Sequence, residues 1–463
     1  MKKGLIQVMI ANIINLAIGL LNSFFLPKYL SVETYAMIKT YALYISYAGF
    51  FHLGYLDGMY LKYGGKKLNE VNDREYGTDF GNLLFMEFIA GVSIAVLSCL
   101  LRDPIILAFS FGMLLNNIIS CFQMLFQAVG EFKLYSSALN FKTIIAFFGS
   151  IILLFVFKSD NYISYVVCQV AAGIVPAIYL AIILNKRVNF LTNVSIKWSE
   201  FKENISSGFV LMLGNFSSTM FTGIDRWFVK FFLTTKDFAI YSFATSVDSL
   251  VTVFITPIAI TLYNTLCKEQ NLGKIKQLKD MILVWGFIVA ALAFPAKWII
   301  EHFLTKYVEA IPIIVVLFTA QALYAVIKGV FVNLYKARKQ QNVYFQHMIL
   351  MVIIAVILDA IMYFIFRSGI SLAVGTLMTA VSWLSFEEIG NEDIRYGFKQ
   401  WLYIAILMVI FITSGLCLPT VIGFVVYVAA MLALNMLFMG KPFITMLNSV
   451  FGIFISKLKR GKR

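Results

Sequence analysis

Three cations lie inside long apolar stretches, where a charge is costly. Arg226 and Lys230 belong to the segment GIDRWFVK at residues 223–230, and Lys328 has apolar residues on both sides. A charge at the centre of a membrane-spanning helix costs about 2.5–3.5 kcal/mol, so such residues are candidates for function. A spacing of four places Arg226 and Lys230 on one helix face, where they could hold an anion. The alternative is that these cations extend to the membrane surface, with Asp225 neutralising Arg226.

Four acids lie within the same kind of stretch. They are Asp57, Glu87, Asp248 and Asp359. All four are candidates for binding a proton or a sodium ion, because ionisable residues within membrane spans mark ion pathways. Asp248 and Asp359 are the better two. The alternative for each acid is a structural role as the partner of a buried lysine or of an asparagine amide.

Aromatic residues recur at near-helical spacing around the second apolar stretch. They are Tyr41, Tyr44, Phe51 and Tyr55. Flat rings with polar edges suit the faces of sugars in a water-filled cavity, whereas a packing stripe is the alternative. Gly54 and Gly58 form a GxxxG spacing, which permits close contact between helices.

The composition identifies the setting of these residues. Of 463 residues, 60% are hydrophobic and 13% are charged, against about 45–50% and about 25% in soluble domains. The chain is therefore expected to be a polytopic membrane protein. It contains no Walker, GxSxG or HExxH motif, so we expect neither an ATP-driven pump nor a hydrolase, and no enzyme. The cysteines and histidines lack metal-ligand spacing, so no metal or other cofactor is expected beyond a proton or sodium gradient.

Fourteen apolar stretches must position the candidate residues. A helix needs about 20 apolar residues to cross the hydrocarbon core, and each stretch is close to that length. The stretches are 5–26, 36–58, 81–101, 104–127, 138–157, 161–184, 206–232, 239–266, 281–303, 310–333, 344–366, 369–390, 399–418 and 420–440. The expected fold is all-α, with about 14 transmembrane helices.

The basic residues indicate the orientation in the cell membrane. With fourteen spans and an inside N-terminus, Lys and Arg, among them Lys142, favour the cytoplasmic side roughly three to one. Both termini are therefore expected in the cytoplasm. The net charge of +14 reflects these loops rather than binding to nucleic acid. The basic tail at 457–463 is expected to lie on anionic membrane lipids.

A short internal repeat suggests two lobes. Residues 30–36 (LSVETYA) parallel residues 233–239 (LTTKDFA) at an offset of 203. Six helices per lobe would give parallel repeats around a central cavity, which is a transporter architecture. The predicted division is an N-terminal lobe at 1–190, a C-terminal lobe at 191–395, and a final helix pair with the basic tail at 396–463.

Several segments resemble the polysaccharide-type lipid-linked oligosaccharide flippases of the multidrug/oligosaccharidyl-lipid/polysaccharide exporter superfamily. They are residues 53–58 (LGYLDG), 61–66 (LKYGGK), 127–132 (QAVGEF), 225–229 (DRWFV) and 238–242 (FAIYS). The resemblance implies alternating access and a substrate with a diphosphate-linked glycan on a polyprenyl tail. Among the cations, only Arg226 matches a motif position. Asn22 and Ser23 stand where the offset predicts Asp and Arg, so the resemblance assigns no phosphate-binding cation to the first lobe.

The interpretation that follows is a transporter that flips such a lipid-linked glycan from the cytoplasmic to the outer leaflet. Arg226, Lys230 and Lys328 would then bind the diphosphate, and polysaccharide polymerases or glycosyltransferases would be natural partners. A cation-coupled multidrug exporter of the same fold is the main alternative, and it would need acids rather than cations in its cavity. A membrane scaffold would need no buried charge.

Overall fold

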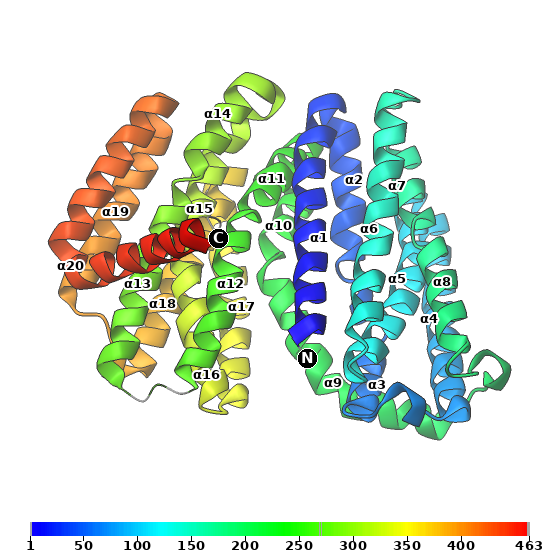
Figure 1. Cartoon of the computed structure of the whole chain (residues 1–463). Helices are drawn as coiled ribbons and strands as arrows, with labels where there is room; N and C mark the ends of the chain where they lie inside the picture. Colours follow the sequence, from blue (N-terminus) through cyan, green and yellow to red (C-terminus); the bar gives the residue numbers. More distant parts are fainter. Residues whose placement is uncertain (1, 268, 270, 461–463) are drawn as a thin grey trace. The chain divides into compact units, whose positions relative to one another are not determined.

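The protein is described by a computed structural model that covers residues 2–267, 269 and 271–460, and the regular elements of these residues are all helical (Figure 1). The chain forms two compact units, Met1–Gly223 and Ile224–Arg463. We call them the N-terminal unit and the C-terminal unit. The predicted division at residues 190 and 395 stays a prediction. In the basic tail, residues 461–463 lie outside the described residues.

The N-terminal unit contains the helices from α1 to α9. Their bounds are α1 Lys2–Tyr29, α2 Val32–Ile45, α3 Tyr55–Tyr63, α4 Asp73–Leu101, α5 Pro104–Ala128, α6 Phe132–Phe155, α7 Tyr162–Ala171, α8 Ile174–Asn185 and α9 Trp198–Phe221.

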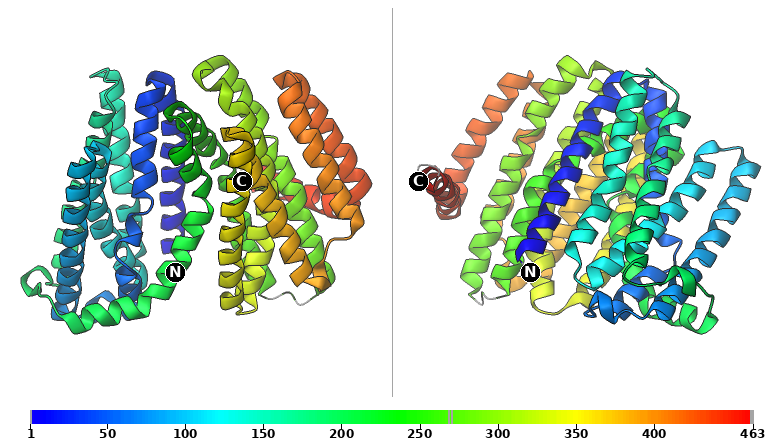
Figure 2. Two further views of the ribbon diagram at one scale, coloured as in Figure 1. Left: turned by 180° about the vertical axis from the view of Figure 1, so that it is seen from behind. Right: turned by 45° about the vertical axis from the view of Figure 1, so that its right-hand side comes forward.

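The C-terminal unit contains the helices from α10 to α20. Their bounds are α10 Ile224–Phe232, α11 Thr235–Asp248, α12 Val251–Leu266, α13 Leu272–Ala290, α14 Ala293–Phe303, α15 Ile311–Val326, α16 Val332–Ala337, α17 Gln341–Phe366, α18 Gly369–Gly390, α19 Phe398–Cys417 and α20 Thr420–Arg460. A π-helical turn, Ile327–Phe331, connects α15 to α16. Within each unit the long helices run roughly side by side (Figure 2).

Eleven helical segments of the described residues are long and apolar enough to cross a membrane. This confirms an all-α, multi-pass membrane protein, whereas the count of fourteen stays a prediction. The eleven include Gly369–Gly390, the twelfth predicted stretch. The predicted stretch 36–58 is broken, because residues 46–54 separate α2 from α3. The 14 residues of α2 span only about 21 Å, less than the roughly 30 Å hydrocarbon core.

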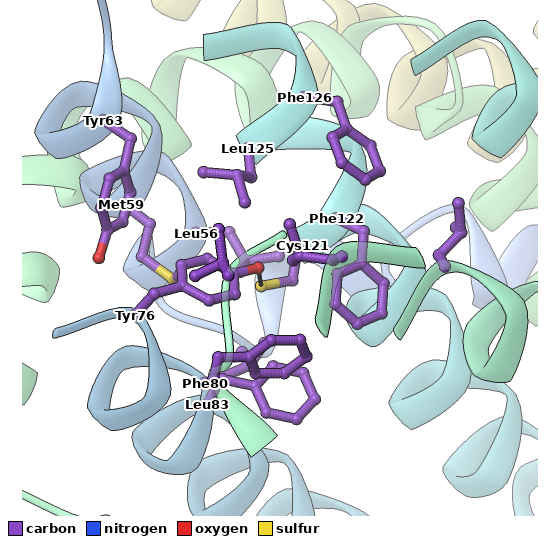
Figure 3. Close-up of a cluster of buried hydrophobic side chains, with 14 of the residues drawn as sticks. Leu56, Met59, Tyr63, Tyr76, Phe80, Leu83, Cys121, Phe122, Leu125 and Phe126 are labelled. Atoms are coloured by element: carbon purple, nitrogen blue, oxygen red, sulfur yellow. Dashed lines mark hydrogen bonds between the residues drawn. The ribbon is translucent and has the colours of Figure 1, made fainter. Parts of the chain in front are cut away.

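The core of the N-terminal unit is rich in aromatic side chains from α3, α4 and α5 (Figure 3). Phe80 stacks on Phe122 with ring centroids 5.7 Å apart, and Phe190 meets Phe80 edge-on at 5.1 Å. Offset and edge-on pairs of this kind stabilise beyond the area that they bury. The core holds α3 and α4 against α5, and so fixes the side chains on their other faces.

The predicted GxxxG contact is present between α3 and α9. A Cβ atom added at Gly58 would overlap the backbone of Asn204, and one added at Gly208 would overlap the backbone of Gly54 and Gly58. Gly54 also has φ +82°, a left-handed conformation that glycine adopts without strain. The three glycines therefore allow the two helix backbones to touch.

The repeat predicted from the sequence extends to helix boundaries. Ser31 caps α2 by accepting a hydrogen bond from the backbone N–H of Thr34 at 3.2 Å, and Thr234 caps α11 by accepting one from Asp237 at 3.1 Å. Both helices are 14 residues long. Their first and last residues are related by the same offset of 203, so the repeat has a structural counterpart.

The C-terminal unit is built around α15, the most buried of the candidate spans. It packs against α11, α13, α18 and α19. Gly286 on α13 lies against the backbone of Ala322, and Gly415 on α19 lies against Val315. Small residues at such contacts allow helices to approach closely. This packing surrounds α15 with other helices and fixes which way its polar side chains point.

Candidate functional site

The helix α10 begins directly after the turn at Thr222 and Gly223 and carries three charged residues. Asp225 is buried, and its carboxylate accepts hydrogen bonds from the Arg226 backbone N–H and the Tyr241 hydroxyl, both at 2.7 Å. The carboxylate is therefore held by neutral donors from the start of α10 and from α11. Asp225 does not form an ion pair with the Arg226 side chain.

The guanidinium of Arg226 has little compensation. The side chain is half-buried, and its Nε is buried without a hydrogen-bond partner. In the part of the chain that the structure describes, no carboxylate lies within ion-pair distance of it. Its charge interacts with Asp225 at longer range. An uncompensated cation of this kind is suited to binding an anion.

Lys230 lies one turn further along α10. Its ammonium is 5.3 Å from the centre of the Phe238 ring on α11, a cation–π distance. The structure therefore places Arg226 and Lys230 on the same short helix but gives Lys230 an aromatic partner.

Lys328 lies in the π-helical turn after α15. π-Helical turns are rare and occur frequently at functional sites. The Lys328 ammonium is 5.4 Å from the centre of the Tyr324 ring, and it interacts electrostatically with Asp248 at the end of α11. Asp248 accepts a hydrogen bond from the Gln321 amide at 2.7 Å, whereas its other oxygen has no partner. Lys328 and Asp248 thus lie near one another, as the alternative structural role for Asp248 predicted.

Asp359 on α17 is the least compensated acid. It is 1% exposed, and neither carboxylate oxygen has a hydrogen-bond partner. One oxygen lies against Gly375 of α18, where a side chain would overlap it. Asp359 interacts electrostatically with Asp225 and with Tyr241 and Tyr324. It is therefore within reach of the same group of side chains.

These contacts bring predicted residues from distant segments into one group, which we call the C-terminal polar cluster. Its members are Asp225, Arg226, Tyr241, Asp248, Gln321, Tyr324, Lys328 and Asp359. Tyr241, Gln321 and Tyr324 were not among the candidate site residues predicted from the sequence. Residues 321, 324 and 328 follow the i, i+3, i+7 pattern of one helix face. This pattern could have linked Gln321 and Tyr324 to Lys328 from the sequence.

The acids predicted in the N-terminal unit have amide partners. The Asn117 amide donates to Glu87 at 2.7 Å, and the Asn215 amide donates to Asp57 at 3.1 Å. Both acids are buried. Asp57 also lines a cavity of about 200 Å³ together with His52. Each acid therefore has an asparagine amide as a partner, whereas one oxygen of Glu87 has none, and ion coupling by either acid stays a prediction.

The predicted aromatic residues do not form one stripe, because the helix breaks between α2 and α3. Tyr44 and Phe51 each pack edge-on against Phe109. Tyr55 is fully buried and donates a hydrogen bond to the backbone oxygen of Asp79 at 3.1 Å. Tyr41 lines a cavity of about 400 Å³ in the N-terminal unit. A sugar-facing role stays a prediction.

Lys142 lines the same cavity. Its charge was expected on the cytoplasmic side of the membrane. In the structure Lys142 lies well inside α6. The signal for a buried Lys142 in the sequence was its position within the predicted stretch 138–157.

Among the described residues, no group of three or more His, Cys, Asp or Glu side chains is arranged to hold a metal ion.

Comparisons with known proteins agree with this architecture. Residues 83–268 match the sequence model of a family described as polysaccharide biosynthesis protein. The structure is similar to that of the lipid II flippase MurJ in an inward closed conformation, with a TM-score of 0.72 and 14% identity, covering 94% of this chain and 98% of that one.

A second similar structure is an inward-facing multidrug resistance MATE family transporter of the MOP superfamily. Its TM-score is 0.51 with 13% identity, covering 83% of this chain and 95% of that one. A search of the curated proteins finds no match to the chain. The fold is therefore that of MurJ and MATE transporters, as the resemblance implied.

Proposed function

We propose that this chain, a multi-pass membrane protein with the fold of MurJ and MATE transporters, flips a polyprenyl-diphosphate-linked oligosaccharide across the cell membrane. The direction is from the cytoplasmic to the outer leaflet, by alternating access, with both termini in the cytoplasm. The match of residues 83–268 to a polysaccharide biosynthesis family supports a glycan substrate. The flippase activity in the name of MurJ supports a lipid-linked one.

The observation that carries the proposal is that the guanidinium of Arg226 forms no ion pair and has a buried Nε without a hydrogen-bond partner. A diphosphate must leave water to cross a region of low dielectric, and a fixed cation lowers the cost of that step. Arg226 has no ion pair with a carboxylate within the described part of the chain, so its charge is available for a ligand. Arginine also presents several donors to phosphate oxygens.

Lys328 and Lys230 are the supporting cations. Lys328 lies near Asp248, and the two charges partly balance each other while no substrate is bound. Lys230 adds positive charge one turn from Arg226 and remains over the Phe238 ring. In this proposal Arg226 makes the main contact with the diphosphate, and the lysines reduce the net negative charge of the complex.

The acids supply the coupling to an ion gradient. Asp359 is buried and has no hydrogen-bond donor, so a proton or a sodium ion would compensate its charge. Asp248 is the second candidate, because one of its oxygens is free of partners. Because both acids interact electrostatically with members of the cluster that holds Arg226, binding an ion would alter the field that the diphosphate meets.

The same acids support the alternative of a cation-coupled drug exporter, since three carboxylates, Asp225, Asp248 and Asp359, accompany Arg226 and Lys328 in the cluster. The two functions differ in which charge the substrate needs. A diphosphate substrate requires Arg226, whereas a cationic drug would be repelled by it. Removing Arg226 therefore abolishes transport in the first case and preserves or improves it in the second.

The experiment compares lipid-linked glycans in cells that contain the wild-type protein, no protein, or a variant. We expect a polyprenyl-diphosphate oligosaccharide to accumulate on the inner leaflet without the protein and in the Arg226→Ala variant. Arg226→Lys should retain partial export. The matched control is Lys236→Ala, which removes an exposed cation on α11 that pairs with Glu309. Normal export in the Arg226→Ala variant would show that Arg226 is not the binding residue. Absence of accumulation without the protein would refute the function.

A further inference from the structure

A polar cavity of about 400 Å³ lies within the N-terminal unit, between side chains of α1, α2, α5, α6 and α7. A water molecule occupies about 30 Å³ of liquid, so the cavity has room for roughly a dozen waters or a compact polar group. Among its lining residues are the polar side chains Asn22, Tyr41, Asn116, Gln123, Lys142 and Gln169. None of the residues that line it is acidic.

Lys142 is the single cation of this cavity, and its charge is not neutralised. Its ammonium donates a hydrogen bond to the Asn116 side-chain oxygen at 3.2 Å, which is a neutral partner. Within the described residues, it forms no ion pair with a carboxylate. The position is ten residues into α6, about 15 Å along the helix from its start. Tyr41 also lines the cavity, but its hydroxyl is buried against Gly112 of α5, which is not a lining residue.

The internal repeat relates this cavity to the C-terminal polar cluster. At the offset of 203, Asn22 corresponds to Asp225 and Ser23 to Arg226. The first helix has therefore lost the cation that α10 carries. In the N-terminal unit, α6 packs along α1 (Figure 1), and both Lys142 and Asn22 line the cavity. Lys142 of α6 therefore shares a cavity with Asn22, the counterpart of Asp225, whereas Ser23, the counterpart of Arg226, is not among the lining residues.

We propose that this cavity is a second anion-binding site, in which Lys142 and the surrounding side-chain amides hold a phosphate ester of the transported lipid. The proposal rests on the function proposed above and adds a binding site on the N-terminal unit. One ammonium with hydroxyl and amide donors around it matches an oxyanion with several acceptor oxygens. The absence of a carboxylate among the lining residues disfavours a cation as the occupant.

Binding to the purified protein in detergent tests this proposal. The probes are farnesyl diphosphate, which carries an isoprenyl tail, and inorganic pyrophosphate, which does not. Because a second cation, Arg226, binds the same chemistry in our proposal, the measurements use the Arg226→Ala background. Adding Lys142→Ala should weaken binding of farnesyl diphosphate at least tenfold, whereas Lys142→Arg should retain it. The matched control is Lys133→Ala, which removes an exposed cation from the same helix.

The two probes identify the source of the anion. Tighter binding of farnesyl diphosphate than of pyrophosphate supports a lipid-linked ester, whereas equal binding that depends on Lys142 identifies a site for free phosphate compounds and overturns the lipid assignment. If Lys142→Ala leaves binding unchanged, or if the Arg226→Ala protein binds neither probe, the cavity is not an anion-binding site.

The stability of the Lys142 variant keeps the test independent of folding. Lys142 has no acidic partner to leave behind, so Lys142→Gln should unfold at the wild-type temperature and still lose binding. A lysine with a structural role would instead lower that temperature. Failure of the site would leave the export defect of Arg226→Ala intact, so it would be distinguishable from failure of the proposed function.

Discussion

Two buried charge groups in the C-terminal unit are built in opposite ways. Lys279 on α13 is completely enclosed and donates to Glu388 at 2.6 Å and to the backbone oxygen of Ile394 at 2.5 Å. Its ammonium also lies 3.6 Å from the centre of the Tyr396 ring. Arg226 in the C-terminal polar cluster has no comparable set of partners.

One acid from each group shows the same difference. Glu387, beside Glu388, accepts hydrogen bonds from the Tyr335 hydroxyl at 2.6 Å and from the Trp383 indole at 3.0 Å. Asp359 in the polar cluster accepts none. A charge with every partner in place holds helices together, whereas a charge without partners is available to a ligand. The Lys279 group is therefore suited to stabilising the fold, whereas the C-terminal polar cluster contains the unpartnered groups on which the proposed function depends.

Removing Lys279 should have the largest effect on stability. Lys279→Ala leaves the Glu388 carboxylate buried without its cation, and loss of one partner of a buried pair costs about 3–5 kcal/mol. We expect a large drop in the unfolding temperature of the purified protein. Replacing both residues by Met and Leu should recover much of it. Lys274→Ala, which removes an exposed cation of the same helix, is the control. A Lys279→Ala variant as stable as the wild type would contradict the structural role of the Lys279 group.

Removing the Tyr335 hydroxyl should have a smaller effect. Tyr335→Phe deprives Glu387 of one donor while leaving the indole of Trp383 in place, and a lost bond to a buried charged group costs about 1.5–3 kcal/mol. Thermal unfolding measures this change. Tyr344→Phe is the control, because the Tyr344 hydroxyl contacts only the weak acceptor sulfur of Met348, at 3.6 Å. Equal losses in the two variants would count against a structural role for Glu387.

Asp359→Asn should change stability by a smaller amount and in the opposite direction. The substitution removes a buried charge that has no hydrogen-bond donor, so the unfolding temperature should stay the same or rise, by no more than about 1 kcal/mol of stability. Export should lose its dependence on the ion gradient if Asp359 binds the coupling ion. A clear loss of stability would mean that Asp359 has a structural partner and would weaken its proposed coupling role.

Arg226→Ala should have the smallest effect on stability. Its guanidinium forms no ion pair, and buried Asp225 keeps its two hydrogen-bond donors, so removing Arg226 takes away only a longer-range interaction with that acid. The unfolding temperature should be within error of the wild type although export is lost. A destabilised Arg226→Ala variant would place Arg226 with the structural charges, and its export defect could then be explained by misfolding.

The sequence by itself determined the class of fold and most of its elements. Apolar length predicted the membrane helices, eleven of which meet the requirements for a span. The match between residues 30–36 and 233–239 predicted the repeat, and in the structure Ser31 and Thr234 cap helices of equal length. The spacing of Arg226 and Lys230 predicted one face of a helix, and both residues lie on α10. These features depend on neighbours within a few residues, so they can be predicted from the sequence.

The tertiary structure alone decided which buried charges have partners. Lys279 finds Glu388 across 109 residues, and Glu87 finds Asn117 across 30. The side of α6 from which Lys142 reaches a cavity depends on how that helix packs against α1 and α5. Helix rotation and packing set these distances, and no local spacing encodes them. The sequence could therefore name the candidate charges, whereas only the assembled helices separated satisfied charges from free ones.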